Sequence, residues 1–169
     1  EKFFLKVFSK LKILFYFRDE LKIEKPYYYP TLINSYQARI GISQLSNLKN
    51  NLNHRRAMVK ICKKYINNKY ATRKDFALLR YSFLVKSKKK FINKFSKFFD
   101  LDTWYDTVLH GRNKNFNKLY YKKGSCKNAE KICKHIVNFP THLRIDNKNF
   151  EKILIDNKNF IKNNILKNV

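Results

Sequence analysis

The chain has 169 residues, of which 44% are hydrophobic and 16% aromatic, enough apolar side chains to bury a core and to exclude disorder throughout. It contains only 3 glycines and 3 prolines, too few for the many tight reversals of a β-sandwich or barrel, so a helix-rich fold is expected. Lysine and arginine together number 38 against 12 acidic residues, which gives a formal net charge of +26.

The positive charge makes a basic nucleic-acid-binding module the alternative function, because a basic surface attracts phosphate backbones of any sequence. Division of the chain at residues 56 and 112 gives 11, 14 and 13 basic residues, so the charge is spread out. Lysines outnumber arginines 30 to 8, and lysine is a residue of A/T-rich codons, as are the abundant asparagine and phenylalanine. Coding bias therefore accounts for much of the lysine excess, and no specific nucleic-acid recognition is expected.

Cysteine usage and hydropathy predict a cytoplasmic location. The 3 cysteines, Cys62, Cys126 and Cys133, are odd in number and no secretory signal precedes them, as is usual in a reducing compartment. No stretch reaches the roughly 18 uncharged apolar residues that a membrane span requires. The chain begins at Glu1 and its only methionine is Met58, so we expect it to be part of a longer protein.

Residues 3–17 place apolar and basic side chains on different faces at helical spacing, which predicts an amphipathic helix. Such a helix binds either a membrane surface or the rest of a larger fold, and the second is favoured at this length. Two prolines, Pro26 and Pro30, then bracket an extended connector, because each disfavours helix in the residue before it.

A long helix is predicted over residues 35–66, opened by a capping box of Asn34 and Gln37. One stripe of its surface is apolar or small at spacings of 3 and 4, which predicts a buried face or a seam between two domains. Gly41 lies on this stripe, and we expect another backbone to cross closely there. The stripe comprises Ala38, Gly41, Leu45, Leu48, Leu52, Val59, Cys62 and Ile66.

From residue 73 onward, segments with the alternation of a strand interchange with segments of helical spacing. The predicted elements are a strand at 79–85, a helix at 88–99, a strand at 103–109, a helix at 126–135, a strand at 136–139, and a last helix through the repeated IDNKNF at 145–150 and 155–160. This order predicts an α/β or α+β domain.

Cysteines and histidines near the C-terminus raise the question of a metal site, because zinc prefers thiolate and imidazole ligands. Cys126 and Cys133 lie seven residues apart on one predicted helix, without the close pair that grips zinc, and His135 and His142 do not supply one. No metal site is therefore expected. With 3 glycines, the chain also has no glycine-rich loop to hold a phosphate.

Four separated segments agree in order and spacing with one known pattern. They are SYQARIGISQL with HRRAMVKICKKY (35–45 and 54–65), LRYSFLV (79–85), DTWYDTVLH (102–110) and KGSCKNAEKICKHIVNFPTHLRI (123–145). Over about residues 30–165 the chain resembles the DegT/DnrJ/StrS-type sugar aminotransferases.

The resemblance implies a pyridoxal-phosphate enzyme of the aspartate-aminotransferase-like fold, a homodimer when full length, that transfers an amino group from an amino acid to a nucleotide-linked keto sugar. It implies that residues 1–72 are the end of the large domain and the long interdomain helix, and that residues 73–169 are the small C-terminal α/β domain. The Schiff-base lysine and the main cofactor site would lie upstream. No catalytic or cofactor-binding residue is therefore assigned in this chain, which we expect to be inactive alone.

The same resemblance bears on individual positions. His110 and His142 match motif positions near strand ends and are the candidate substrate-binding residues. Where the family has an asparagine and an arginine that reach the neighbouring subunit's active site, this chain has Pro30 and Leu32, whose side chains cannot bind phosphate or carboxylate. The family's C-P-x-A-E motif has Lys127 at its proline, which is expected to loosen the turn and to leave the glutamate on its helix.

Overall fold

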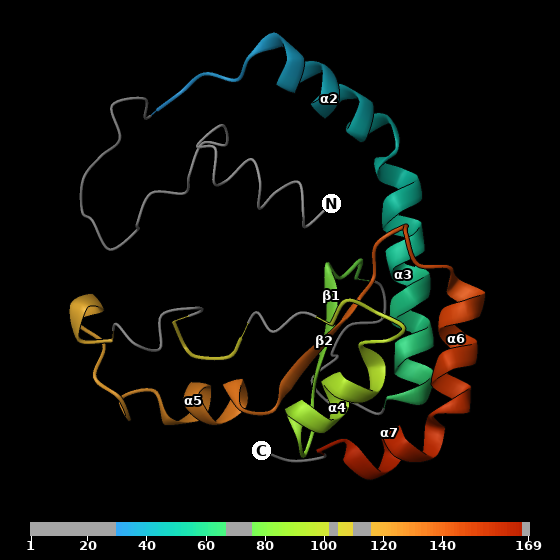
Figure 1. Cartoon of the computed structure of the whole chain (residues 1–169). Coiled ribbons are helices and arrows are strands. Elements are labelled where there is room, and N and C mark those ends of the chain that lie inside the picture. Colours follow the sequence, from blue (N-terminus) through green and yellow to red (C-terminus); the bar gives the residue numbers. More distant parts are fainter. Residues whose placement is uncertain (1–29, 67–75, 102–104, 110–115, 167–169) are drawn as a thin grey trace.

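The computed structural model of the chain describes residues 30–66, 76–101, 105–109 and 116–166, so the predicted helix at 3–17 lies outside the described residues (Figure 1). No helix in these ranges is long and apolar enough to cross a membrane. The elements, in chain order, are α2 (Ser35–Ser46), α3 (Leu48–Tyr65), β1 (Arg80–Leu84), α4 (Lys88–Phe95), the 3₁₀ turn η1 (Asn117–Leu119), α5 (Lys127–Cys133), β2 (Ile136–Pro140), α6 (Asn147–Asp156) and α7 (Lys158–Asn164).

The two described strands form a small antiparallel sheet, with Arg80 opposite Pro140 and Leu84 opposite Ile136. This confirms the strands predicted at 79–85 and 136–139. Because strand side chains alternate, the sheet has one apolar face and one more polar face. The apolar face carries Tyr81, Phe83, Val137 and Phe139, all buried.

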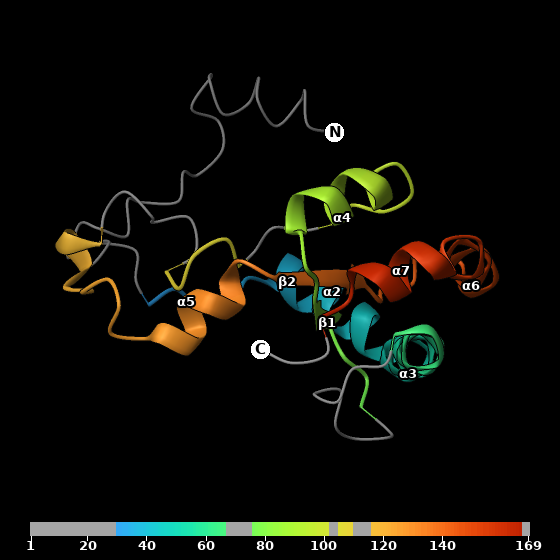
Figure 2. The ribbon, with the colours of Figure 1, turned by 90° about the horizontal axis from the view of Figure 1, so that it is seen from below.

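The helices gather over this apolar face. Figure 2 shows α4, α7 with α6, and α3 in an arc to one side of the strands. Phe139 lies at the centre of the packing, because its ring is 5.1 to 5.9 Å from five other phenylalanine rings. Such pairs stabilise a core beyond the area that they bury. The five partners are Phe83, Phe91, Phe95, Phe99 and Phe150.

The helix predicted over 35–66 is two helices, and the break is at Asn47. Its beginning is as predicted, since Asn34 and Gln37 form the reciprocal capping box. At the break, the Ser46 hydroxyl and the Asn47 side-chain amide both donate hydrogen bonds to the carbonyl of Ser43, at 2.7 and 3.4 Å. Side chains that compete for backbone acceptors in this way favour a helix end.

Only the second half of the predicted apolar stripe is buried. Val59, Cys62 and Ile66 join the core, whereas Leu45 on α2 is 66% exposed. Apart from the neighbouring backbone of its own helix, no described atom lies within 4 Å of the position that a Cβ on Gly41 would take, so the expected close crossing is not formed among the described residues. Helix α2 therefore projects from the packed part of the chain, as Figure 1 shows.

Two further predictions need correction. Residues 105–109 of the strand predicted at 103–109 form turns and bends, and residues 102–104 lie outside the described part. The Thr107 hydroxyl donates to the carbonyl of Leu109 at 2.8 Å, a local bond that holds the chain bent. The last helix is likewise two, because the Asn157 side chain donates to the carbonyl of Ile153 at 2.8 Å and ends α6.

A guanidinium ties α3 to the ends of both strands. Nη1 of Arg55 donates to the carbonyl of Leu79 at 2.9 Å and to Oγ1 of Thr141 at 3.0 Å. The fully buried Thr141 hydroxyl in turn donates to the carbonyls of Leu78 and Leu79, at 2.6 and 2.8 Å. Nε of Arg55 is held by Asn51 at 2.6 Å. This arrangement, the Arg55–Thr141 clamp, fixes where the chain leaves β2.

The aromatic core yields a stability prediction. Phe139→Ala should lower the free energy of unfolding by roughly 3 to 5 kcal/mol, because it empties a fully buried site. Phe98→Ala is the matched control: Phe98 is 40% exposed at the edge of the same cluster, and its truncation should cost less than half as much. Urea denaturation followed by circular dichroism measures both, and equal losses would contradict a core centred on Phe139.

The clamp yields a second prediction. Arg55→Lys keeps the charge but loses the planar fork that reaches two strand ends at once, so it should destabilise the fold by roughly 1 to 2 kcal/mol. The neighbouring exposed Arg56 is the control, and Arg56→Lys should change stability by less than about 0.5 kcal/mol. The same urea titration distinguishes the two, and a neutral Arg55→Lys would show that the clamp does not hold the strands.

Candidate functional site

The two predicted substrate-binding residues have different outcomes. His110 lies outside the described residues, whereas His142 begins the turn that follows β2. The backbone N–H of Ile145 donates to the carbonyl of His142 at 3.2 Å and closes this turn. Nε2 of His54, on α3, lies 3.1 Å from the same carbonyl. The main chain at His142 is thus held from within the turn and from α3.

The side chain of His142 lies in a positive environment. Burial lowers the pKa of His142, and the guanidinium groups of Arg144, Arg55 and Arg80 lower it further because they repel the protonated ring. Nδ1 of His142 is buried and has no hydrogen-bond partner. Both effects favour the neutral imidazole, and the three arginines come from α3, β1 and the turn itself.

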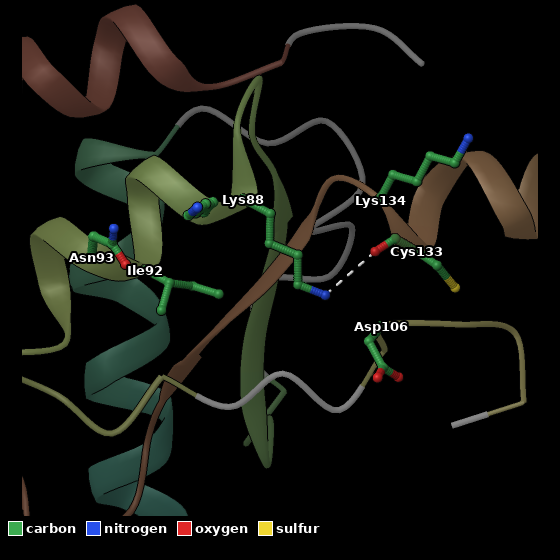
Figure 3. Close-up of a pocket in the computed structure, with 7 residues that line it drawn as sticks. Lys88, Ile92, Asn93, Asp106, Cys133 and Lys134 are labelled. Atoms are coloured by element: carbon green, nitrogen blue, oxygen red, sulfur yellow. Dashed lines mark hydrogen bonds between the residues drawn. The ribbon is translucent and has the colours of Figure 1, made fainter. Parts of the chain in front are cut away.

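A separate open pocket of about 400 Å³ lies between α4, the chain near residue 106 and the end of α5 (Figure 3). The Lys88 side chain reaches across it, and Nζ donates to the carbonyls of Tyr105 and Cys133, at 3.0 and 3.3 Å. Desolvation lowers the pKa of Lys88, and the charge of Asp106 opposes that shift. The lining comprises Lys88, Lys89, Ile92, Asn93, Asp106, Cys133 and Lys134.

This pocket does not fit pyridoxal phosphate. A Schiff-base lysine must offer a free amine, whereas Nζ of Lys88 is engaged by two backbone carbonyls. The lining also contains no aromatic side chain to cover a pyridine ring. The described residues therefore form no cofactor site here, and Lys88 joins α4 to the chain around it.

The glutamate of the C-x-x-A-E segment closes a tight turn. Oε1 of Glu130 accepts hydrogen bonds from the backbone N–H of Gly124 at 2.5 Å and from the Tyr121 hydroxyl at 2.8 Å. These bonds lower the pKa of Glu130 because they stabilise its carboxylate. Gly124 has φ +92°, which favours glycine. Lys127 is the first residue of α5, so Glu130 is on its helix as predicted.

The two cysteines at the ends of this helix lie in different environments. Cys126 is exposed at the helix start, and Cys133 is buried at its end. Among the described residues, no group of three or more histidine, cysteine, aspartate or glutamate side chains is placed to hold a metal ion.

Pro30 and Leu32, whose side chains cannot bind phosphate or carboxylate, are exposed before α2, and Leu32 is 93% exposed. Arg80 and Arg144, whose charges lower the pKa of His142, are not singled out by the sequence. Their only signal there is that they are arginines in a chain with 30 lysines and 8 arginines.

Comparison with known proteins gives one family. The model of the DegT/DnrJ/EryC1/StrS aminotransferase family matches residues 25–156, most of the chain. Comparison with curated proteins and with solved structures gave no match. The family match spans α2 through α6 and includes His142, Arg55 and Glu130. The chain therefore belongs to the DegT/DnrJ/EryC1/StrS aminotransferase family.

Proposed function

We propose that the chain is the C-terminal part of a pyridoxal-phosphate-dependent aminotransferase that acts on nucleotide-linked keto sugars with an amino acid as amino donor. The family match over residues 25–156 is the observation that carries this proposal. The order of elements supports it, since a helical stretch leads into a small mixed domain that ends in two helices.

The proposal assigns the cofactor to a part of the protein upstream of this chain. Pyridoxal phosphate, when bound there, supplies the electron sink for transamination. This chain would supply the wall of the active site that faces the substrate. His142 is the candidate contact, and His110, outside the described residues, is the second candidate. On this proposal the 169-residue chain alone is inactive, because it has no lysine in the context of the family's Schiff-base lysine.

Helix α2 supports the proposal of a larger assembly. Tyr36, Ile40, Ile42 and Leu45 are all exposed and lie on different sides of the helix. A helix that is apolar on several sides is stable in water only when neighbouring structure covers it. We assign residues 1–72 to the interdomain segment, covered by the large domain and the second subunit of a cytoplasmic homodimer, and residues 73–169 to the small domain.

The assignment of the whole activity is tested by reading the coding sequence upstream of Glu1. We expect an in-frame large domain with a Schiff-base lysine, and the longer product should aminate a nucleotide-linked keto sugar when supplied with pyridoxal phosphate and an amino acid. A stop codon or an unrelated sequence directly upstream would end the assignment of transamination.

The absence of a cofactor lysine in this chain is tested directly. The purified chain is incubated with pyridoxal phosphate, reduced with borohydride and mapped by peptide mass spectrometry. We expect low, scattered labelling of exposed lysines, because Lys88, which reaches across the described pocket, is engaged by two backbone carbonyls. In the control variant Lys88→Arg, the labelling of all other lysines should be the same as in the unaltered chain. Stoichiometric labelling of a single lysine would contradict the proposal that the cofactor is held upstream.

A further inference from the structure

The apolar surface of α2 divides into two sides. Tyr36 and Ile40, four residues apart, lie on one side, and Ile42 and Leu45, three residues apart, lie on the other. The two sides are opposite because two residues of an α-helix are about 200° of rotation. All four side chains are exposed, and no residue of α2 is buried. The packed part of the chain, as far as the structure describes it, therefore covers neither side (Figure 1).

The side that carries Ile42 and Leu45 has the shape to receive another helix. Ala38 and Gly41 share this side with the two large residues. The distance between two packed helices depends on the side chains at their contact, so small residues let a second helix approach closely. No described atom outside the neighbouring backbone lies within 4 Å of a Cβ placed on Gly41, so this space is open. Two apolar side chains then flank a place for a bulky apolar residue.

The chain itself contains a segment with the matching stripe. Residues 3–17, outside the described residues, have apolar side chains at helical spacing and are expected to form an amphipathic helix. The family match begins at residue 25, so membership in the family does not say what this segment contacts. Its stripe consists of bulky residues, as the open space beside Gly41 requires. They are Phe4, Val7, Phe8, Leu11 and Phe15.

The length of the connection allows this segment to lie along α2. Residues 18–34 join the two, and these 17 residues reach roughly 55 Å when fully extended. Helix α2 has 12 residues and is about 18 Å long, so the segment can pack in either direction. A connection this short gives an effective local concentration on the order of millimolar. The segment therefore has an advantage over a second copy of the chain at micromolar concentration.

The charges favour α2 over the other described helices. Residues 3–17 contain three lysines and no acidic residue, so a basic helix would repel them. Arg39 is the only charged residue of α2, whereas α3 has six lysines and arginines. Arg39 lies to the side of Ile42 and Leu45 rather than between them. Among the described α-helices, α2 thus combines the lowest charge with the most exposed apolar surface.

We propose that residues 3–17 pack as a helix against the side of α2 that carries Ile42 and Leu45. Each helix covers an apolar stripe of the other, while Lys6 and Lys10 stay in solvent. The other side of α2, with Tyr36 and Ile40, is left for the larger assembly of the proposed function. The packing itself requires neither a large domain nor a cofactor, so the inference goes beyond that function.

Amide hydrogen exchange of the whole 169-residue chain tests the packing. A helix of 12 residues is marginal in water, so contact with residues 3–17 should slow exchange along α2 by roughly tenfold or more. Leu11→Lys and Leu45→Lys should each remove this protection, because they place a charge in the contact. Ser9→Lys and Ser43→Lys add the same charge on the opposite sides and should keep it. Exchange in β1 and β2 should be unchanged in all four variants, which shows that the core is intact.

A spin label identifies the occupant of α2. Cys62 and Cys133 are buried, so in the variant Cys126→Ser a nitroxide can be attached selectively at Ser9→Cys. We expect it to broaden the NMR signals of α2 in its own chain and not those of an isotope-labelled chain mixed with it. Broadening only between chains would assign α2 to a second copy.

Three other results would overturn the packing. They are unprotected α2 amides in the unaltered chain, equal loss of protection in the matched variants, and protection that appears only when phosphatidylglycerol vesicles are added. The last would assign residues 3–17 to a membrane surface. None of these results bears on an upstream Schiff-base lysine, so this inference and the proposed function fail separately.

Discussion

The structure depends on how a sheet of two strands is kept folded. Two paired strands alone are marginally stable in water, and β1 and β2 are joined by a long excursion that adds an entropic cost to their pairing. The aromatic cluster around Phe139 offsets both. Because α4, α6 and the strands all contribute rings to it, the sheet and its helices are stable only together. This shared core explains why the position of one strand end is fixed relative to α3.

That constraint carries over to the polar end of the sheet. Once Val59 and Cys62 place α3 in the core, Arg55, one turn earlier, is brought to the ends of both strands. There it donates to the carbonyl of Leu79, which also accepts from the Thr141 hydroxyl. The clamp then fixes Thr141 and, through it, the turn at His142. The backbone at His142 thus depends on core packing as well as on the hydrogen bond within its own turn.

Patterns in the sequence predict the elements that depend on residues close to one another in the chain. The alternation of Tyr81 and Phe83 predicted β1, and the capping box of Asn34 and Gln37 predicted the start of α2. The breaks at Asn47 and Asn157 were missed because apolar spacing continues through them while a side-chain amide competes for a backbone carbonyl. The convergence on His142 could not be predicted, since it depends on tertiary placement.

The strand predicted at 103–109 is also wrong because strand formation depends on tertiary placement. Its aromatic and β-branched residues favour extended chain, but the described sheet consists of β1 and β2, and residues 105–109 pair with neither. Strand propensity alone does not supply a partner, and the hydroxyl of Thr107 bonds locally instead.

Helix α2 separates local from tertiary stability within one chain. Its 12 residues are at the lower limit for a helix without packing, yet they carry a capping box and no buried side chain. The box fixes where the helix begins, but it cannot fix its direction, because Asn47 interrupts the continuity with α3. If α2 is covered as proposed, the surface that covers it sets the position of Pro30 and Leu32. Under the same proposal, their lack of phosphate-binding groups would affect the active site of the neighbouring subunit rather than this chain's own core.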